Sequence, residues 1–128
     1  MIVLESVSKL YTLSKEVSVP AVQKVSLTVD AGEFVVITGR SGSGKTTLLN
    51  LVAGLAKPSA GRVLLDGKDL WQMPDKDQSG QRSRLIGFIF QFPSLLPTLT
   101  ALDNVILPTT FVNGSGPDDK SERAAELL

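Results

Sequence analysis

Hydrophobic and polar residues alternate at the start of the chain, and this pattern predicts antiparallel strands. The alternation runs over residues 2–8 and again over residues 22–29, and we expect a loop over residues 11–20 between them. Alternation of this kind is typical of a strand that buries only one of its faces. A shorter apolar segment at residues 62–65 is followed by Asp66-Gly67, the type of dipeptide that most strongly favours a two-residue hairpin. The sequence therefore predicts a β-rich beginning.

Two other apolar segments lack this alternation, which predicts strands buried on both faces. The first covers residues 34–38 (FVVIT), and the second covers residues 85–90 (LIGFIF). Continuous runs of β-branched, aliphatic and aromatic residues are typical of strands with no solvent-exposed face. We therefore expect both segments to lie in the interior of a sheet.

The second half of the chain predicts short helices separated by irregular segments. Residues 69–81 are polar and contain several helix breakers, so we expect them to be irregular. A short helix is expected over residues 100–106, stopped by the proline that follows two residues later. After a loop over residues 113–117, a last helix is expected, with Asp118 or Asp119 as its cap.

A glycine-rich segment, GRSGSGKTT, follows the first buried segment directly and matches the phosphate-binding pattern GxxxxGK[ST]. Its glycines let the backbone turn tightly and approach a ligand without a Cβ in the way. Backbone N–H groups then converge on one concavity, and the helix expected over residues 47–53, ended by Gly54, adds its positive N-terminal end. Lys45 would reach the β- and γ-phosphates, and the Thr46 hydroxyl would bind Mg²⁺.

A Gly/Ser-rich surface loop could match this pattern by coincidence. Four fixed positions between an expected strand and an expected helix make nucleotide binding the better interpretation. The predicted nucleotide contacts within the loop are Gly39, Ser41, Gly42, Ser43, Gly44, Lys45, Thr46 and Thr47.

The composition of the chain restricts its possible functions. The chain has 128 residues, a formal net charge of zero, no cysteine and no histidine. A nucleic-acid-binding surface would normally need a basic excess, so none is expected. The absent residue types exclude disulfides, thiolate metal sites, a Ser-His triad and histidine metal ligands. No apolar segment approaches the roughly 20 residues of a membrane-spanning helix, and the first residues lack the plan of a signal peptide. We expect a soluble single domain that reaches a membrane only through a partner.

The order of these motifs makes the sequence similar to one family. A β-rich start, the GRSGSGKTT loop, the AGRVLLDGKDL hairpin and the segment RLIGFIFQFPSLLPTLTALDNVILP resemble the ATP-binding subunit of ABC transporters over nearly the whole chain. Within that family, IGFIFQ followed by LLPTLTALDNV and LP resembles the branch of lipoprotein-releasing and macrolide- or peptide-export ATPases.

The resemblance implies an α/β fold, with part of a P-loop NTPase core and an N-terminal antiparallel β subdomain. The β subdomain would comprise about residues 1–32 and 60–70, and the core about residues 33–56 and 84–91. A helical subdomain would begin over about residues 92–128. Asp66 follows an apolar strand, like the aspartate that supports Mg²⁺ in P-loop enzymes, but its hairpin chemistry and the family's β subdomain identify it as a turn residue.

The resemblance also implies roles for residues outside the loop. Gln91 would contact Mg²⁺ and the attacking water, so Lys45 and Gln91 are the catalytic candidates, and Thr46 and Gln91 are the metal candidates. Tyr11 would stack on adenine, which needs only a ring face. Residues 92–97 would help to form a groove for a helix of the transport subunit. Without the resemblance, Gln91 is a polar residue at a strand end, Tyr11 is an ordinary loop tyrosine, and residues 92–97 belong to the core.

The cofactors implied in this way are ATP and Mg²⁺. The implied partners are a transmembrane permease subunit and a second ATP-binding domain, on the cytoplasmic side of the cell membrane, with the domain attached peripherally. ATP would clamp two domains together, and its hydrolysis would release them.

The family's LSGGQ-like signature, its strand ending in Asp-Glu and its switch histidine do not occur in the sequence. We therefore expect an N-terminal fragment that holds one half of a composite site and hydrolyses little ATP alone. The unpaired edge at residues 34–38 and the apolar end at Leu127 and Leu128 predict self-association.

Three alternatives remain open at this stage. The first is a soluble ABC-type ATPase that acts on DNA or ribosomes, against which the apolar segment after Gln91 and the absence of a basic face both count. The second is a small kinase or GTPase, although the sequence has no [NT]KxD guanine motif and Tyr11 suits adenine. The third is a regulatory module that only binds nucleotide.

Overall fold

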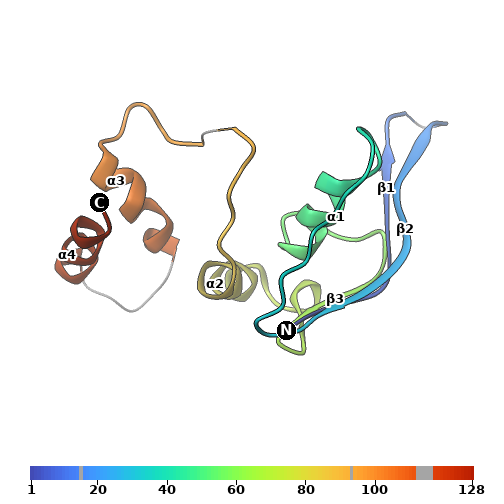
Figure 1. Cartoon of the computed structure of the whole chain (residues 1–128), viewed down its shortest axis with the longest axis horizontal. Helices are drawn as coiled ribbons and strands as arrows, with labels where there is room; N and C mark the ends of the chain where they lie inside the picture. The colour runs from blue at the N-terminus through green and yellow to red at the C-terminus, as the bar shows by residue number, and fades with distance from the viewer. Residues whose placement is uncertain (15, 93, 112–116) are drawn as a thin grey trace. The chain divides into compact units, whose positions relative to one another are not determined.

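The computed structural model describes residues 1–14, 16–92, 94–111 and 117–128. The chain divides into two compact units, Met1–Pro74 and Asp75–Leu128 (Figure 1). The first unit contains the sheet and one α-helix, and the second unit is helical. Residues 113–116 of the predicted loop lie outside the described residues.

The first unit is built on a four-stranded antiparallel sheet with the strand order β2-β1-β3-β4. Its strands are β1 (Ile2–Thr12), β2 (Ser18–Val29), β3 (Ala60–Leu65) and β4 (Lys68–Asp69). Figure 1 shows β1, β2 and β3 side by side in a bent sheet. The predicted antiparallel start is therefore confirmed.

The loop predicted over residues 11–20 is wrong at both ends. Tyr11 is still part of β1 and pairs with Val19 of β2, and the reversal is confined to the residues between the two strands. There the Leu13 N–H donates to the Val17 carbonyl at 2.9 Å. Residues 10–12 and 18–20, next to the reversal, have exposed side chains on both faces of the sheet. Their hydrophobic and polar residues therefore do not alternate, although their backbones are paired.

A bulge in β1 explains why Leu4 and Val7, three positions apart in one strand, are both buried. Ser6 has a positive φ of 48°, and its N–H donates to Ser26 Oγ at 3.0 Å and not to a strand carbonyl. The extra residue reverses the alternation beyond it, so Leu4 and Val7 are both buried. Opposite, Lys24 has a φ of 45°, and its N–H donates to Ser8 Oγ at 2.9 Å.

The hairpin between β3 and β4 forms where the sequence predicted it. Asp66 and Gly67 have φ values of 47° and 75°, as a type I′ turn requires, and Leu65 pairs with Lys68 across the turn. The α-amino group of Met1 lies 2.7 Å from Asp66 Oδ1. The prediction that Asp66 is a turn residue is confirmed.

The helix α1 (Lys45–Val52) packs against the sheet, as Figure 1 shows. Its predicted span is confirmed to within two residues, and Gly54 follows with a φ of 65° in the left-handed region. The buried core of the unit joins one face of the sheet to this helix. It consists of Leu4, Val7, Val22, Leu51 and Val63, with Leu48 and Val52 packed at its margin.

The two strands predicted to be buried on both faces are wrong. Residues 34–38 and 86–90 are not in strands, and Leu85 is the last residue of a helix. Phe34 is 90% exposed and Ile89 is 98% exposed. Hydrophobic content predicts burial, but a strand forms only when a neighbour pairs with its N–H and C=O groups, and no segment among the described residues pairs with either one.

The second unit contains α2 (Asp75–Leu85), α3 (Ala101–Ile106) and α4 (Pro117–Leu127). The 3₁₀ helices are Leu70–Gln72, in the first unit, and Leu107–Phe111. The irregular segment predicted over residues 69–81 is therefore wrong. Acidic residues in the first turn of α2 and arginines in its last turn favour a helix through the helix dipole, despite Gly80 in its interior.

The other two helices agree better with the sequence. The short helix predicted over residues 100–106 is confirmed to within one residue, and the structure shows Thr100 as its N-cap. The Asp103 side chain accepts from the Thr100 N–H, which completes a capping box. The last helix begins at Pro117, so Asp118 and Asp119 lie inside its first turn and not at its cap. No helix in the described part of the chain has both the length and the apolar character needed to cross a membrane.

Candidate nucleotide-binding site

The glycine-rich loop is held open by backbone conformations that favour glycine. Gly42 and Gly44 have φ values of 78° and 90°, in the left-handed region. Gly44 is the N-cap residue of α1 and has no side chain to bond the first N–H groups of the helix. These groups and the positive end of the helix dipole are therefore left for an anionic ligand.

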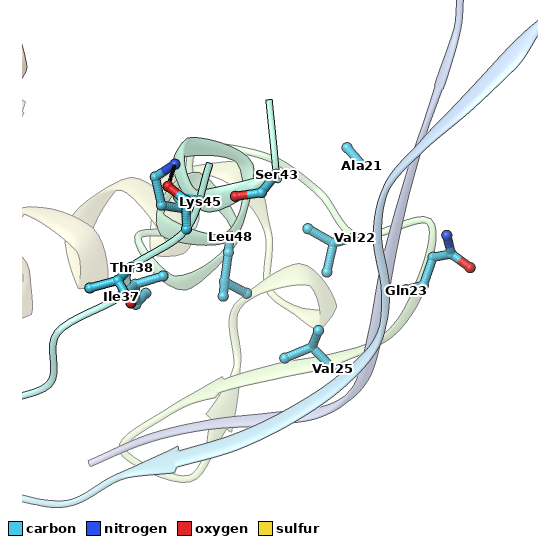
Figure 2. A pocket seen from close by; sticks show the side chains of 11 residues that line it. Ala21, Val22, Gln23, Val25, Ile37, Thr38, Ser43, Lys45 and Leu48 are labelled. Carbon is cyan, nitrogen blue, oxygen red and sulfur yellow. Dashed lines mark hydrogen bonds between the residues drawn. The ribbon is translucent and has the colours of Figure 1, made fainter. Parts of the chain in front are cut away.

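Lys45 lies across the beginning of this loop. Its Nζ donates to the carbonyl oxygen of Gly39 at 2.8 Å (Figure 2). It also donates to the carbonyl oxygen of Arg40 at 2.8 Å. The Ser43 N–H donates to the same Arg40 carbonyl at 3.2 Å, which closes the turn. The ammonium group is thus held by main-chain oxygens of the loop, and it keeps a third donor for a phosphate oxygen.

An open cavity of about 330 Å³ lies beside the loop. Figure 2 shows Val22 and Val25 of β2 and Leu48 of α1 directed toward the space between the strand and the helix. The volume is in the range of small-molecule sites, which combine apolar walls with a few polar groups. The lining consists of Ala21, Val22, Gln23, Val25, Ile37, Thr38, Gly39, Ser43, Gly44, Lys45 and Leu48.

Only part of the predicted loop set lines this cavity, namely Gly39, Ser43, Gly44 and Lys45. Thr46 and Thr47 lie in the first turn of α1, and the Thr46 side chain is exposed. Ser41 and Gly42 form the exposed tip of the loop. The contribution of β2 to the cavity was missed from the sequence, because its residues have the pattern of an ordinary alternating strand.

The structure brings Tyr11 close to the cavity along the hairpin, but not into its lining. Tyr11 pairs with Val19 of β2, and Ala21 follows two residues after Val19. The Tyr11 side chain is 40% exposed, and the Lys9 ammonium lies 5.3 Å from the centre of its ring. Its ring therefore has a polar neighbour and a surface open to solvent.

Gln91 belongs to the second unit, where it lies in an exposed bend directly after Phe90. The cavity itself is formed by residues of the first unit alone. Within the described residues, no group of three or more His, Cys, Asp or Glu side chains could hold a metal ion. A hard cation at this site would therefore take its ligands from hydroxyl and amide oxygens, phosphate and water.

The sequence also matches known proteins. Residues 22–128 match the family model described as ABC transporter. The chain belongs to this family of ATP-binding cassette proteins, whose members bind ATP and act as ATPases in their intact form. The resemblance found in the sequence is therefore confirmed.

Curated relatives carry the names of ATP-binding transporter proteins. The macrolide export ATP-binding/permease protein MacB of Syntrophobacter fumaroxidans is 40% identical over 100% of this chain and 18% of its own length. The lipoprotein-releasing system ATP-binding protein LolD of Anaeromyxobacter dehalogenans is 44% identical over 98% of this chain and 52% of its own length. A Thermotoga maritima ABC transporter ATP-binding protein is 46% identical over 98% of this chain and 53% of its own length. The chain thus spans about half the length of the last two relatives, and less of the first.

Solved structures agree with the α/β cassette fold. Two dimeric structures of the ATP-binding cassette MJ0796, one of them in a post-hydrolysis state bound to ADP and phosphate, each match with a TM-score of 0.86. Both are 40% identical to this chain, covering 98% of it and 55% of the matched chain. The predicted class, part of a P-loop NTPase core with an N-terminal antiparallel β subdomain, is confirmed.

Proposed function

We propose that this chain is the ATP-binding part of an ABC transporter subunit, which couples the binding and hydrolysis of ATP to the movement of a substrate across a membrane. The observation that carries the proposal is Lys45, which lines the cavity beside the glycine loop and whose ammonium is held by the Gly39 and Arg40 carbonyls. Nearly all that phosphoryl transfer asks of a protein is positioning and charge stabilisation, and this loop is built for both.

The residues of the loop would divide the work on a bound nucleotide. Backbone N–H groups around Gly42 and Gly44 would hold phosphate oxygens, and Lys45 would neutralise charge on the terminal phosphates. The same neighbourhood includes Ser41, Ser43 and Thr47, whose hydroxyls could add hydrogen bonds. The apolar side of the cavity, with Val22, would exclude water from one flank of the ligand.

Mg²⁺ fits a site of this kind, because the loop offers hydroxyl oxygens and the ligand offers phosphate oxygens. Thr46 and Gln91 are the residues that would hold the ion, and Gln91 would also orient water. When bound, Mg²⁺ would neutralise negative charge on the phosphates. Within the cavity lining, Lys45 is the one charged side chain, so we expect the chain alone to bind ATP but to hydrolyse it slowly.

A membrane permease subunit and a second ATP-binding domain are the proposed partners, on the cytoplasmic side of the cell membrane. Two comparisons support this part of the proposal. The name of the relative MacB includes both ATP-binding and permease functions, and MJ0796 is dimeric. The exposed side chains of Phe92 and Leu95, 75% and 72% accessible, are candidates for the permease contact. Leu96 is tied to α3, because its N–H donates to Asn104 Oδ1 at 2.8 Å and its carbonyl accepts from Asn104 Nδ2 at 3.1 Å.

The division into a β subdomain, a core and a helical subdomain stays a prediction, since the chain divides into two compact units, Met1–Pro74 and Asp75–Leu128, with other bounds. Limited proteolysis with and without Mg-ATP would identify the segments that nucleotide protects.

Nucleotide binding tests the proposal directly. A ligand at about 100 times its dissociation constant stabilises a protein by about 2.7 kcal/mol, so saturating Mg-ATP should raise the melting temperature. Lys45→Ala should lose most of that rise, whereas Lys68→Ala, which removes an exposed lysine of β4, should keep it. A melting curve that Mg-ATP leaves unchanged in the unmodified chain contradicts the proposal.

A further inference from the structure

Lys9 and Tyr11 form a pair on β1 that no motif in the sequence indicates. The Lys9 Nζ lies 5.3 Å from the centre of the Tyr11 ring, within the distance at which a cation is attracted to a ring face. The same Nζ donates to the Lys57 carbonyl at 2.7 Å. The ammonium is therefore fixed from two directions, by the aromatic ring and by the turn that follows α1.

That turn also holds the backbone of the strand next to Tyr11. The Ser59 N–H donates to the Ser8 carbonyl at 2.8 Å, and the Leu10 N–H donates to Ser59 Oγ at 3.0 Å. Together with the bond from Lys9 to Lys57, residues 8–10 are held at three points by residues 57–59. Tyr11 comes directly after this fastened segment, so its backbone position is well defined.

The ring also lies on the side of the sheet that faces α1. Beyond Val7 the register shifts between the two strands place the extra residues in β2, so side chains keep alternating along β1. Val7, Lys9 and Tyr11 therefore project from the same face of β1. Val7 is buried in the core cluster that includes Leu51 of α1. Tyr11 therefore extends the face that carries the core toward the phosphate-binding loop, and its partner Val19 is close in sequence to the cavity-lining residues of β2.

We propose that Lys9 is a positioning residue for the nucleotide base, because it covers one face of the Tyr11 ring, holds that ring in place and leaves the opposite face for the base. The inference rests on the proposed function, in which Tyr11 stacks on adenine. A half-exposed tyrosine without such a neighbour can occupy several rotamers, and fixing it in one of them on binding lowers the affinity of the ligand. A ring that is oriented before the ligand arrives avoids that loss of affinity.

The test separates the base from the phosphates. Isothermal titration calorimetry would measure the binding of Mg-ATP and of Mg-tripolyphosphate to the unmodified chain, Lys9→Met, Lys9→Arg and the control Lys68→Met. We expect Lys9→Met to bind ATP about two- to fivefold more weakly, the range of an exposed cation–π contact, and to bind tripolyphosphate as the unmodified chain does. Lys9→Arg should restore ATP binding because a guanidinium also lies well over a ring face. Lys68→Met should change neither ligand.

A spectroscopic measurement reports on the ring itself. Tyr11 is the only tyrosine of the chain, so 3-fluorotyrosine labelling yields a single ¹⁹F resonance. ATP, but not tripolyphosphate, should shift this resonance in the unmodified chain. In Lys9→Met the ligand-free resonance should move and the ATP-induced shift should be smaller, while Lys9→Arg should resemble the unmodified chain.

Each other outcome overturns the inference. An equal loss of ATP and tripolyphosphate affinity in Lys9→Met would show only a general attraction of phosphate to positive charge, and unchanged ATP affinity would show no role. If Lys9→Met loses its native circular dichroism spectrum, Lys9→Gln replaces it in the same measurements. Failure of the proposed base contact is recognised separately: the unmodified chain then binds ATP no better than tripolyphosphate, and Tyr11→Leu changes neither affinity.

Discussion

The main-chain oxygen of Ala21 occupies the place where a side chain on Gly44 would begin. A Cβ built on Gly44 would lie 2.2 Å from that oxygen, far closer than such atoms approach in proteins. Ala21 belongs to β2, and Gly44 is the N-cap residue of α1. The start of α1 therefore lies directly against the backbone of the sheet, and its position depends on the absence of a side chain on Gly44.

Gly44→Ala should therefore be much more destabilising than Gly42→Ala. Both residues have φ values in the left-handed region, which costs alanine about 1–2 kcal/mol. A Cβ on Gly42 would meet nothing within 4 Å, whereas one on Gly44 would displace the β2 backbone, which adds about 1–3 kcal/mol of overpacking. Urea unfolding of the two variants measures the difference, and equal losses would show that the loop can move away from β2 at no cost.

Leu51→Ala should destabilise the first unit by about 2–5 kcal/mol, the usual cost of a leucine truncated in a core. Leu51 has no exposed surface and packs with Leu4, Val7 and Val63. Leu49, in the same helix, is 45% exposed, so Leu49→Ala should stay within about 0.5 kcal/mol of the unmodified chain. Thermal unfolding followed by far-UV circular dichroism compares the two. Similar losses would mean that burial of Leu51 in the core adds nothing to the stability of α1.

Thr100→Ala should loosen α3. Thr100 Oγ1 accepts from the Asp103 N–H at 3.1 Å, and Asp103 Oδ2 accepts from the Thr100 hydroxyl at 2.6 Å, so the substitution removes both bonds. Loss of an N-cap costs about 1 kcal/mol, which corresponds to roughly fivefold faster hydrogen exchange of the amides in α3. Thr100→Ser keeps the hydroxyl and should exchange like the unmodified chain. Unchanged exchange in Thr100→Ala would show that α3 does not depend on its cap.

The exposed apolar segment after β2 should promote self-association. Phe34 and Val36 are 90% and 65% exposed, and among the described residues no strand pairs with their backbone. Light scattering over a dilution series should show mass that increases with concentration. The double variant Phe34→Ser/Val36→Ser should reduce this increase more than Leu13→Ser, which removes an exposed leucine outside the segment. A monomer at high micromolar concentration would contradict the prediction.

Several features of this protein could be predicted from the sequence because they depend on neighbouring residues only. Asp66 and Gly67 adopt the positive φ values of their turn type, Gly54 follows α1 in the left-handed region, and a short helix follows Thr100. The glycine loop before α1 belongs to this group as well. In each case the favoured conformation is a property of the residue itself and of a hydrogen bond only a few positions away, so the local sequence determines it.

Other features were decided by contacts between distant parts of the chain. The apolar character of residues 34–38 and 86–90 predicts burial, but strand formation needs backbone partners that a sequence pattern does not specify. Three features depend on residues far apart in the chain. The bulge at Ser6 needs Ser26, and the start of α1 needs Gly44 against Ala21. The Lys9 ammonium over the Tyr11 ring needs the Lys57 carbonyl. Whether a side chain lines a cavity or covers a ring depends on how strand, turn and helix pack together, and only the tertiary structure determines that packing.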